Sequence, residues 1–185
     1  AVDEVLRLAD QMVLLSDGRV AAVGPVDEVF GRSDLLPVVG RFEAGAVLET
    51  TVGAHDPATS LSRLDFDGGA MLVPHVDAPP GAGIRVRVRA RDVALATTRP
   101  TGISIRNILP GTVRALTPGT APFVAVDVAV GAATFIASVT SAAVAELALA
   151  PGTEVHVLVK SLAIERRSLG RPVVREGAMD RALDG

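Results

Sequence analysis

The sequence predicts a mainly β protein made of two small tandem barrels, preceded by a short α/β segment. Its 185 residues include 18 Gly and 12 Pro, which divide the chain into short apolar runs of strand length. Several runs alternate apolar and polar residues with period two, as at 84–88 and 155–159. The pattern of residues 44–99 returns in residues 100–166, and such a repeat of short strands is typical of OB-type barrels. A single irregular sandwich is the alternative.

Residues 1–43 form the α/β segment. Asp17-Gly18 lies between two apolar runs and matches the two-residue turn of a β-hairpin. Gly24-Pro25 then breaks the chain. The expected elements, in chain order, are a helix end at Asp3–Ala9, strands at Met12–Leu15 and Val20–Val23, and short helices at Val26–Phe30 and Asp34–Val39. The apolar residues of the two strands need cover or favour association.

Three short matches link the two repeated units, 44–99 and 100–166. They pair Gly45-Ala46-Val47 with Gly111-Thr112-Val113, Leu64-Asp65-Phe66 with Val126-Asp127-Val128, and Pro80-Gly81 with Pro151-Gly152. The second unit has an additional Ala-rich helix at 141–149, with Thr140 or Ser141 as its N-cap. Residues 167–185 mix charges with Gly and Pro without periodicity, which predicts a loosely held, flexible tail.

Composition excludes several classes of protein. The net charge of −3 argues against binding to a phosphate backbone, and five Phe with no Trp or Tyr are too few to stack on bases, so no nucleic-acid partner is expected. The absence of Cys excludes disulfides and thiolate chemistry. The most apolar stretch, 122–139, contains Asp127 and Gly131, so no membrane insertion is expected. The opening residues resemble no signal peptide and suggest a piece of a longer, cytoplasmic protein.

Three short runs carry the side chains that an oxyanion requires. Ser104-Ile105-Arg106-Asn107 offers hydroxyl, guanidinium and amide donors, and Lys160-Ser161 ends the strand at 155–159. Thr140-Ser141 precedes a helix, where free N–H groups favour an anion. Each run also has an ordinary structural interpretation: an exposed strand arginine, a solvated lysine at a strand end, and a simple N-cap.

Other charged residues predict less specific roles. Four arginines alternate along one strand and indicate a solvated outer face, neutralised by neighbours such as Asp92, or else a patch for an anion or an acidic partner; they are Arg85, Arg87, Arg89 and Arg91. The three histidines, His55, His75 and His156, have no ligand spacing, so no bare metal ion is expected. No nucleophile elbow or paired catalytic carboxylates are visible, and Gly-Lys-Ser and Gly-Lys-Thr do not occur, so the chain is not expected to be an enzyme.

Several of these runs resemble a known family. Asp3–Asp10, Met12–Val20 and Gly24–Phe30 resemble the end of an ABC-transporter ATPase domain. Residues 44–165 resemble the appended molybdate-binding region, of the mop or TOBE type, of a molybdate importer's ATPase subunit. The most specific matches are Thr101–Gly111 and the segment from Glu146 through Val155 to Lys160-Ser161. The resemblance makes residues 1–43 a remnant of the ATPase domain, 44–99 the first TOBE-like repeat, and 100–166 the mop-type module.

The resemblance also implies an oxyanion pocket, often shared between modules or subunits. Carried over residue by residue, it consists of Ser104, Ile105, Arg106, Asn107, Lys160 and Ser161, with Thr140 as a further donor. Its ligand would be molybdate or tungstate, which have similar size and the same acceptor oxygens. The first repeat lacks the Ser-x-Arg-Asn run, and the counterpart of Lys160-Ser161 falls at Arg89-Ala90 or Ala90-Arg91, so this repeat is expected to be structural or to face a partner.

The family therefore implies a regulatory role. The chain would sense cytoplasmic oxyanion and modulate ATP-driven uptake at the inner face of the membrane, as a homodimer or larger oligomer in contact with the membrane permease subunits through the ATPase domain. ATP would bind only the intact parent. Two alternatives stay open: an accessory TOBE domain of an importer for another substrate, and a soluble molybdate buffer or storage protein.

Overall fold

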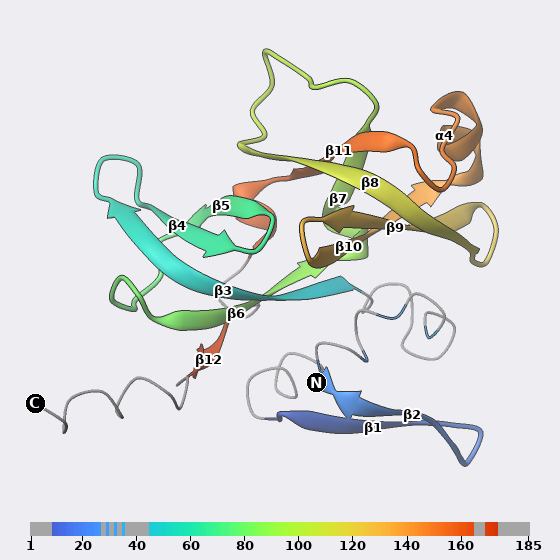
Figure 1. Ribbon diagram of the computed structural model, residues 1–185, viewed down its shortest axis with the longest axis horizontal. Coiled ribbons are helices and arrows are strands. Elements are labelled where there is room, and N and C mark those ends of the chain that lie inside the picture. Colours follow the sequence, from blue (N-terminus) through green and yellow to red (C-terminus); the bar gives the residue numbers. More distant parts are fainter. Residues whose placement is uncertain are drawn as a thin grey trace, which may run out of the picture.

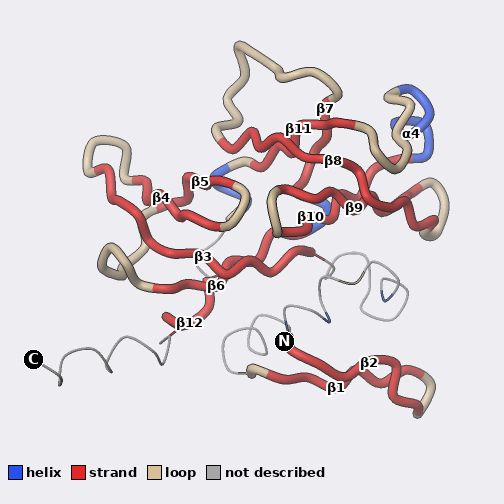
Figure 2. Tube along the Cα trace, in the orientation of Figure 1, coloured by secondary structure: helices blue, strands red, loops and turns tan. Residues whose placement is uncertain are grey.

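The computed structural model describes residues 9–26, 29, 32, 35, 45–164 and 169–173, and these are mainly β, as predicted (Figure 2). No helix within this described part is long and apolar enough to cross a membrane. The helices expected at Asp3–Ala9, Val26–Phe30 and Asp34–Val39 lie wholly or largely outside it. The elements are β1 (Gln11–Ser16), β2 (Arg19–Pro25), β3 (Gly45–Asp56), β4 (Leu61–Phe66), β5 (Gly69–Pro74), β6 (Gly83–Arg89), η2 (Ala90–Asp92), β7 (Val93–Ala96), β8 (Asn107–Pro118), β9 (Phe123–Val130), β10 (Ala133–Thr140), α4 (Ser141–Glu146), β11 (Glu154–Val159), η3 (Ser161–Ala163) and β12 (Leu169–Val173).

The N-terminal hairpin forms as its turn residues predict. β1 and β2 pair antiparallel around Asp17 and Gly18, whose φ angles of 50° and 74° are both positive, as a type I′ turn requires. One face of this ribbon is covered, since Met12 and Leu14 pack against a small cluster that includes Ala22. The other face is open: Val13, Leu15, Val20 and Val23 are each more than half exposed.

Two curled five-stranded sheets make up the rest of the described chain, with strand orders β12-β6-β3-β4-β5 and β10-β9-β8-β11-β7 (Figure 1). They are consistent with OB-like barrels. The expected boundary at residue 99 differs from this topology, because β7 pairs with β11 of the second sheet. Within the expected tail, residues 169–173 form β12 and pair with β6 of the first sheet, and the rest of the tail lies outside the described residues. The two units therefore exchange strands, each completing the other's sheet.

The two sheets also share one hydrophobic core. A single cluster of buried side chains joins Leu48, Leu64 and Met71 of the first sheet to Val126 and Phe135 of the second. Phe66 and Phe135 lie with their ring centroids 6.1 Å apart across the two units. Folding of either unit therefore buries apolar surface of the other, which couples their stabilities.

Backbone geometry defines the repeat more finely than the sequence matches do. In the first unit, Gly81 donates its N–H to the carbonyl of Val52, and in the second, Gly152 donates to Val113. This confirms the match of Pro80-Gly81 with Pro151-Gly152. Since Leu64 lies opposite Val52 and Val128 opposite Val113, the match of Leu64 with Val126 is shifted by two residues. The same registers align Gly111 with Thr50, so its match to Gly45 is wrong.

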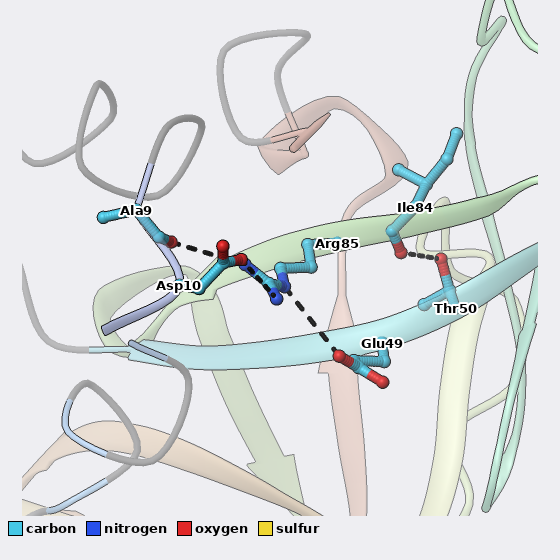
Figure 3. Close-up of polar contacts among 6 residues, drawn as sticks. All are labelled: Ala9, Asp10, Glu49, Thr50, Ile84 and Arg85. Atoms are coloured by element: carbon cyan, nitrogen blue, oxygen red, sulfur yellow. Dashed lines mark hydrogen bonds and ion pairs between the residues drawn. The ribbon is translucent and has the colours of Figure 1, made fainter. Parts of the chain in front are cut away.

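The arginines of β6 are not a uniformly solvated face. Arg87 is only 1% exposed and is the largest fully buried side chain of the described chain. Arg85 is partly covered, because Ala9 and Asp10 lie beside it: its guanidinium is 3.4 Å from the Asp10 carboxylate and 3.8 Å from Glu49 (Figure 3). β10 also contacts β6. The predicted solvated surface is therefore wrong for Arg87, because other elements cover the outer face of this strand.

The turn between β3 and β4 holds a carboxylate, Asp56, whose pKa is lowered by its hydrogen bonds. The Thr59 side chain donates to the Asp56 carboxylate at 2.7 Å, and this hydrogen bond, followed by one from the Ala58 N–H, holds the pKa of Asp56 below its ordinary value. A depressed folded-state pKa contributes stability that is lost as pH falls through it. We expect Thr59→Ala to raise the pKa of Asp56 toward the ordinary value, measured by NMR titration of its carboxyl carbon. An unchanged pKa would show that backbone N–H groups, and not the Thr59 hydroxyl, lower the pKa of Asp56.

Candidate oxyanion site

The ends of two paired strands hold Arg106 and Lys160. β8 and β11 pair antiparallel, with Asn107 opposite Val159 at the last pair. One position further along, the same register sets Arg106 opposite Lys160. Residues opposite one another in an antiparallel pair have Cα atoms about 4.5–5.5 Å apart and side chains on one face of the sheet. Both side chains are exposed, so a guanidinium and an ammonium occupy neighbouring positions at this end of the sheet.

The neighbouring strand adds one acid to this strand end. β7 pairs with β11 on its other side, with Val93 opposite Val159, so the register sets Asp92 opposite Lys160. Asp92 lies 4.0 Å from the guanidinium of Arg91. Arg106 and Lys160 thus bring two positive charges to this strand end against the one carboxylate of Asp92, whose neighbour in sequence is Arg91. The resulting excess of positive charge favours an anion.

Ser161 places an unsatisfied hydroxyl beside the cations. It starts the short turn η3 directly after Lys160, and its Oγ is buried with no hydrogen-bond partner among the described residues. A buried polar atom of this kind indicates a missing donor or acceptor, such as a bound ion. A hydroxyl beside an ammonium is suited to an anion's oxygen.

Ser104, Ile105 and Arg106 lie in the connection between β7 and β8, the long loop above β11 in Figure 1. Ser104 is exposed, and Ile105 is half-buried. Arg106 donates from Nη2 to the carbonyl of Ile103 at 2.9 Å, which closes the loop on itself. The remaining guanidinium N–H groups can serve a ligand, since arginine has five donors.

Asn107 differs from the exposed members of the predicted site. It is 2% exposed, and its side-chain amide makes two hydrogen bonds to the backbone of Leu72 in β5. The residue is thus enclosed between the two sheets rather than presented with Arg106.

Thr140 does not join the other predicted residues within this chain. It caps α4, where its Oγ1 accepts a hydrogen bond from the Ala143 N–H at 3.1 Å, so the predicted N-cap is confirmed. It ends β10, and the register through β9 sets it near Pro118, at the far end of β8 from Arg106. The length of β8 separates Thr140 from the cationic strand end.

The first unit keeps a cation at the position of Lys160 but has no counterpart of the Arg106 and Ser161 side chains. Arg89 precedes η2 with nearly the same backbone angles as Lys160 before η3 (φ −71°, ψ 138° against φ −67°, ψ 135°), which aligns Lys160-Ser161 with Arg89-Ala90. Gly45 lies opposite Arg89, where the second unit has Arg106. A Cβ on Gly45 would collide with the backbone of Val88, so this position admits no side chain without a backbone shift.

The structure also brings together residues that the spacing did not connect. The rings of His55 and His75 lie 4.9 Å apart, and His55 Nδ1 is 2.8 Å from Ser62 Oγ. The Nε2 of His55 lies 2.9 Å from the carbonyl of Ala78, which can only accept, so Nε2 carries a proton and donates it to this carbonyl. Within the described residues, no three His, Asp or Glu side chains gather as a metal site would require.

Comparison with known proteins agrees with this fold. Residues 103–164 match the TOBE domain family. The chain is 45% identical over 166 residues to the molybdenum import ATP-binding protein ModC of Paramagnetospirillum magneticum, covering 90% of this chain and 46% of that protein. It is 44% identical over 170 residues to ModC of Mesorhizobium japonicum, covering 92% and 46%. The chain spans about half the length of these curated relatives.

A solved structure shares the fold. The molybdate-bound form of the cytoplasmic molybdate-binding protein ModG superposes with a TM-score of 0.56 and 30% identity, covering 68% of this chain and 95% of that chain. The sheets and the matched residues define a TOBE-domain protein. More particularly, its homologues are the ModC proteins, and the chain is consistent with the C-terminal part of a molybdenum import ATP-binding protein.

Proposed function

We propose that this chain is the oxyanion-binding, regulatory region of the ATPase subunit of a molybdate ABC importer. Molybdate or tungstate binds at the ends of β8 and β11, where Arg106 and Lys160 neutralise its double negative charge. Ser161 and Ser104 donate hydrogen bonds to its oxygens. The observation that carries this proposal is the register that sets Arg106 opposite Lys160, together with the buried, unpartnered hydroxyl of Ser161, the residue that follows Lys160.

Regulation follows if the anion prefers one arrangement of paired subunits. A ligand shifts an equilibrium only by its difference in affinity for the two states. An anion held between two copies of the chain therefore favours one arrangement of a homodimer or larger assembly, with Thr140 of one copy available to the cations of another. In the parent, cytoplasmic molybdate would thereby damp ATP-driven uptake through the permease subunits.

Thermal melting with three anions tests the proposal. A ligand at 100 times its dissociation constant stabilises the folded state by about 2.7 kcal/mol. We expect molybdate and tungstate to raise the melting temperature and the smaller sulfate to leave it unchanged. A shift with none of the three would contradict the proposal and favour an accessory domain of an importer for another substrate. A molybdate buffer, as the similarity to ModG suggests, would show the same shifts without being part of an ATPase, so an effect of molybdate on the ATPase rate of the parent would contradict that alternative.

A further inference from the structure

Asn107 makes the only side-chain amide bridge between the two sheets that the described residues contain. Its Oδ1 accepts from the Leu72 N–H at 2.7 Å, and its Nδ2 donates to the Leu72 carbonyl at 3.0 Å. One acceptor and one donor thus face one N–H and one C=O. This is the pairing that a peptide group of a neighbouring strand would make.

β5 needs such a partner because it is the edge of its sheet, bonded only to β4. The backbone groups on the free side of an edge strand are unpaired unless another element covers them. Asn107 begins β8 of the other sheet and supplies that partner at Leu72. Asn107 is 2% exposed and Leu72 is half-buried, so breaking the pair leaves a donor and an acceptor largely shielded from water and unsatisfied.

Both segments that carry the proposed anion site, the start of β8 and η3, contact β5. β5 contacts β8, whose first residue Asn107 bonds to Leu72, and it also contacts η3, which begins with Ser161. Asn107 directly follows Arg106, so the hydrogen bonds to Leu72 fix the backbone from which the Arg106 side chain projects. β5, the edge strand of the first sheet, therefore supports the anion site proposed for the second unit.

We infer that Asn107 is a positioning residue and not an oxyanion ligand. It clamps the start of β8 to β5, holds Arg106 opposite Lys160, and transmits anion binding in the second unit to the first. The inference rests on the proposed function, because it concerns the same site. It replaces the ligand role that the Ser-x-Arg-Asn run predicts for the asparagine.

The first test compares molybdate affinity, by calorimetry on the full chain, between Asn107→Ala and Leu109→Ala. Alanine fits sterically, since Ala46 occupies the equivalent position of the first unit. Loss of a residue that orients a ligating group typically weakens binding by about 10–100-fold, and we expect at least about tenfold for Asn107→Ala. Leu109 lies two residues along the same strand in the core, so Leu109→Ala lowers stability and leaves affinity unchanged.

Asn107→Asp supplies a second readout. Its carboxylate can accept from the Leu72 N–H but cannot donate to the Leu72 carbonyl, whereas the protonated acid can do both. Burial raises the pKa of such a carboxyl. Molybdate affinity of this variant should therefore recover as pH falls from about 8 to about 5.5, while that of the unaltered chain stays flat over the same range.

The outcomes separate the two proposals. If the unaltered chain does not bind molybdate, the proposed function and this inference both fall. If it binds, and Asn107→Ala binds equally well or weakens no more than Leu109→Ala, only the positioning role is overturned. If Asn107→Ala does not fold, Asn107→Asp tests the positioning role instead. A molybdate affinity of Asn107→Asp that does not change with pH overturns the inference. Slower hydrogen exchange of the Leu72 amide on adding molybdate supports transmission to β5, and an unchanged rate contradicts it.

Discussion

Arg106→Ala reduces the stabilisation of this chain by molybdate. The guanidinium is the more directional of the two cations at the β8–β11 strand end and forms charge-assisted hydrogen bonds, each of which contributes about 1.5–3 kcal/mol. A loss of that size weakens binding by roughly 10–100-fold. At a molybdate concentration of 100 times the original dissociation constant, a tenfold weaker site gains about 1.4 kcal/mol and a hundredfold weaker site about 0.4 kcal/mol, against about 2.7 kcal/mol for the unaltered site. We therefore expect the melting shift to fall to about half of its original size or less, measured by scanning calorimetry.

Arg114→Ala is the matched control for this variant. Arg114 is an exposed arginine on the same strand, β8, beyond the strand end that holds the site. Its removal changes the net charge by the same amount and should leave the molybdate shift intact. Arg87 is unsuitable, because its burial makes any substitution a test of folding. A full molybdate shift in Arg106→Ala would show that the anion binds elsewhere.

Gly131→Ala should destabilise the whole fold. Gly131 has a φ of 60°, and a Cβ there would lie 2.5 Å from the Cα and 2.7 Å from the N of Gly68. The turn between β9 and β10 thus rests directly on the backbone of the turn between β4 and β5. Left-handed strain costs about 1–2 kcal/mol for a residue with a Cβ, and the forced displacement adds about 1–3 kcal/mol. We expect a loss of about 2–5 kcal/mol in the free energy of unfolding, measured by urea denaturation.

Gly102→Ala isolates the contribution of backbone strain. Gly102 has a similar φ of 68°, but no atom lies within 4 Å of the Cβ position. Its replacement should therefore cost only about 1–2 kcal/mol. Equal losses in the two variants would show that the contact between the two turns contributes nothing to the stability of the paired sheets.

Local patterns predicted the elements whose physics is local. Asp17-Gly18 adopts the positive φ angles that a tight hairpin requires, and Thr140 caps the helix that follows it. The alternation at 155–159 predicts a strand with one buried face, and β11 has Val155 and Val157 inside. In each case the cause lies within a few residues along the chain, so the sequence contains it.

The site was only partly predictable for the same reason. Ser104, Arg106, Lys160 and Ser161 came from donor chemistry and from a family resemblance, but the register that sets two of them opposite each other involves residues more than 50 positions apart. The hydrogen bond between Asn107 and Leu72 joins residues 35 positions apart, and no periodicity of the sequence predicts it. His55, Ser62 and His75 likewise meet only because β3 and β4 pair.

The amino-acid sequence by itself determined a mainly β chain with a duplicated unit, the hairpin turns, the capped helix and the residue types suited to an oxyanion. Tertiary structure alone decided that β7 and β12 cross between the sheets, that Arg87 is buried, and that the amide of Asn107 pairs with an edge strand. Turns, caps and strand alternation depend on neighbours in sequence. Strand exchange and burial depend on partners that the chain acquires only when both sheets pack around one core.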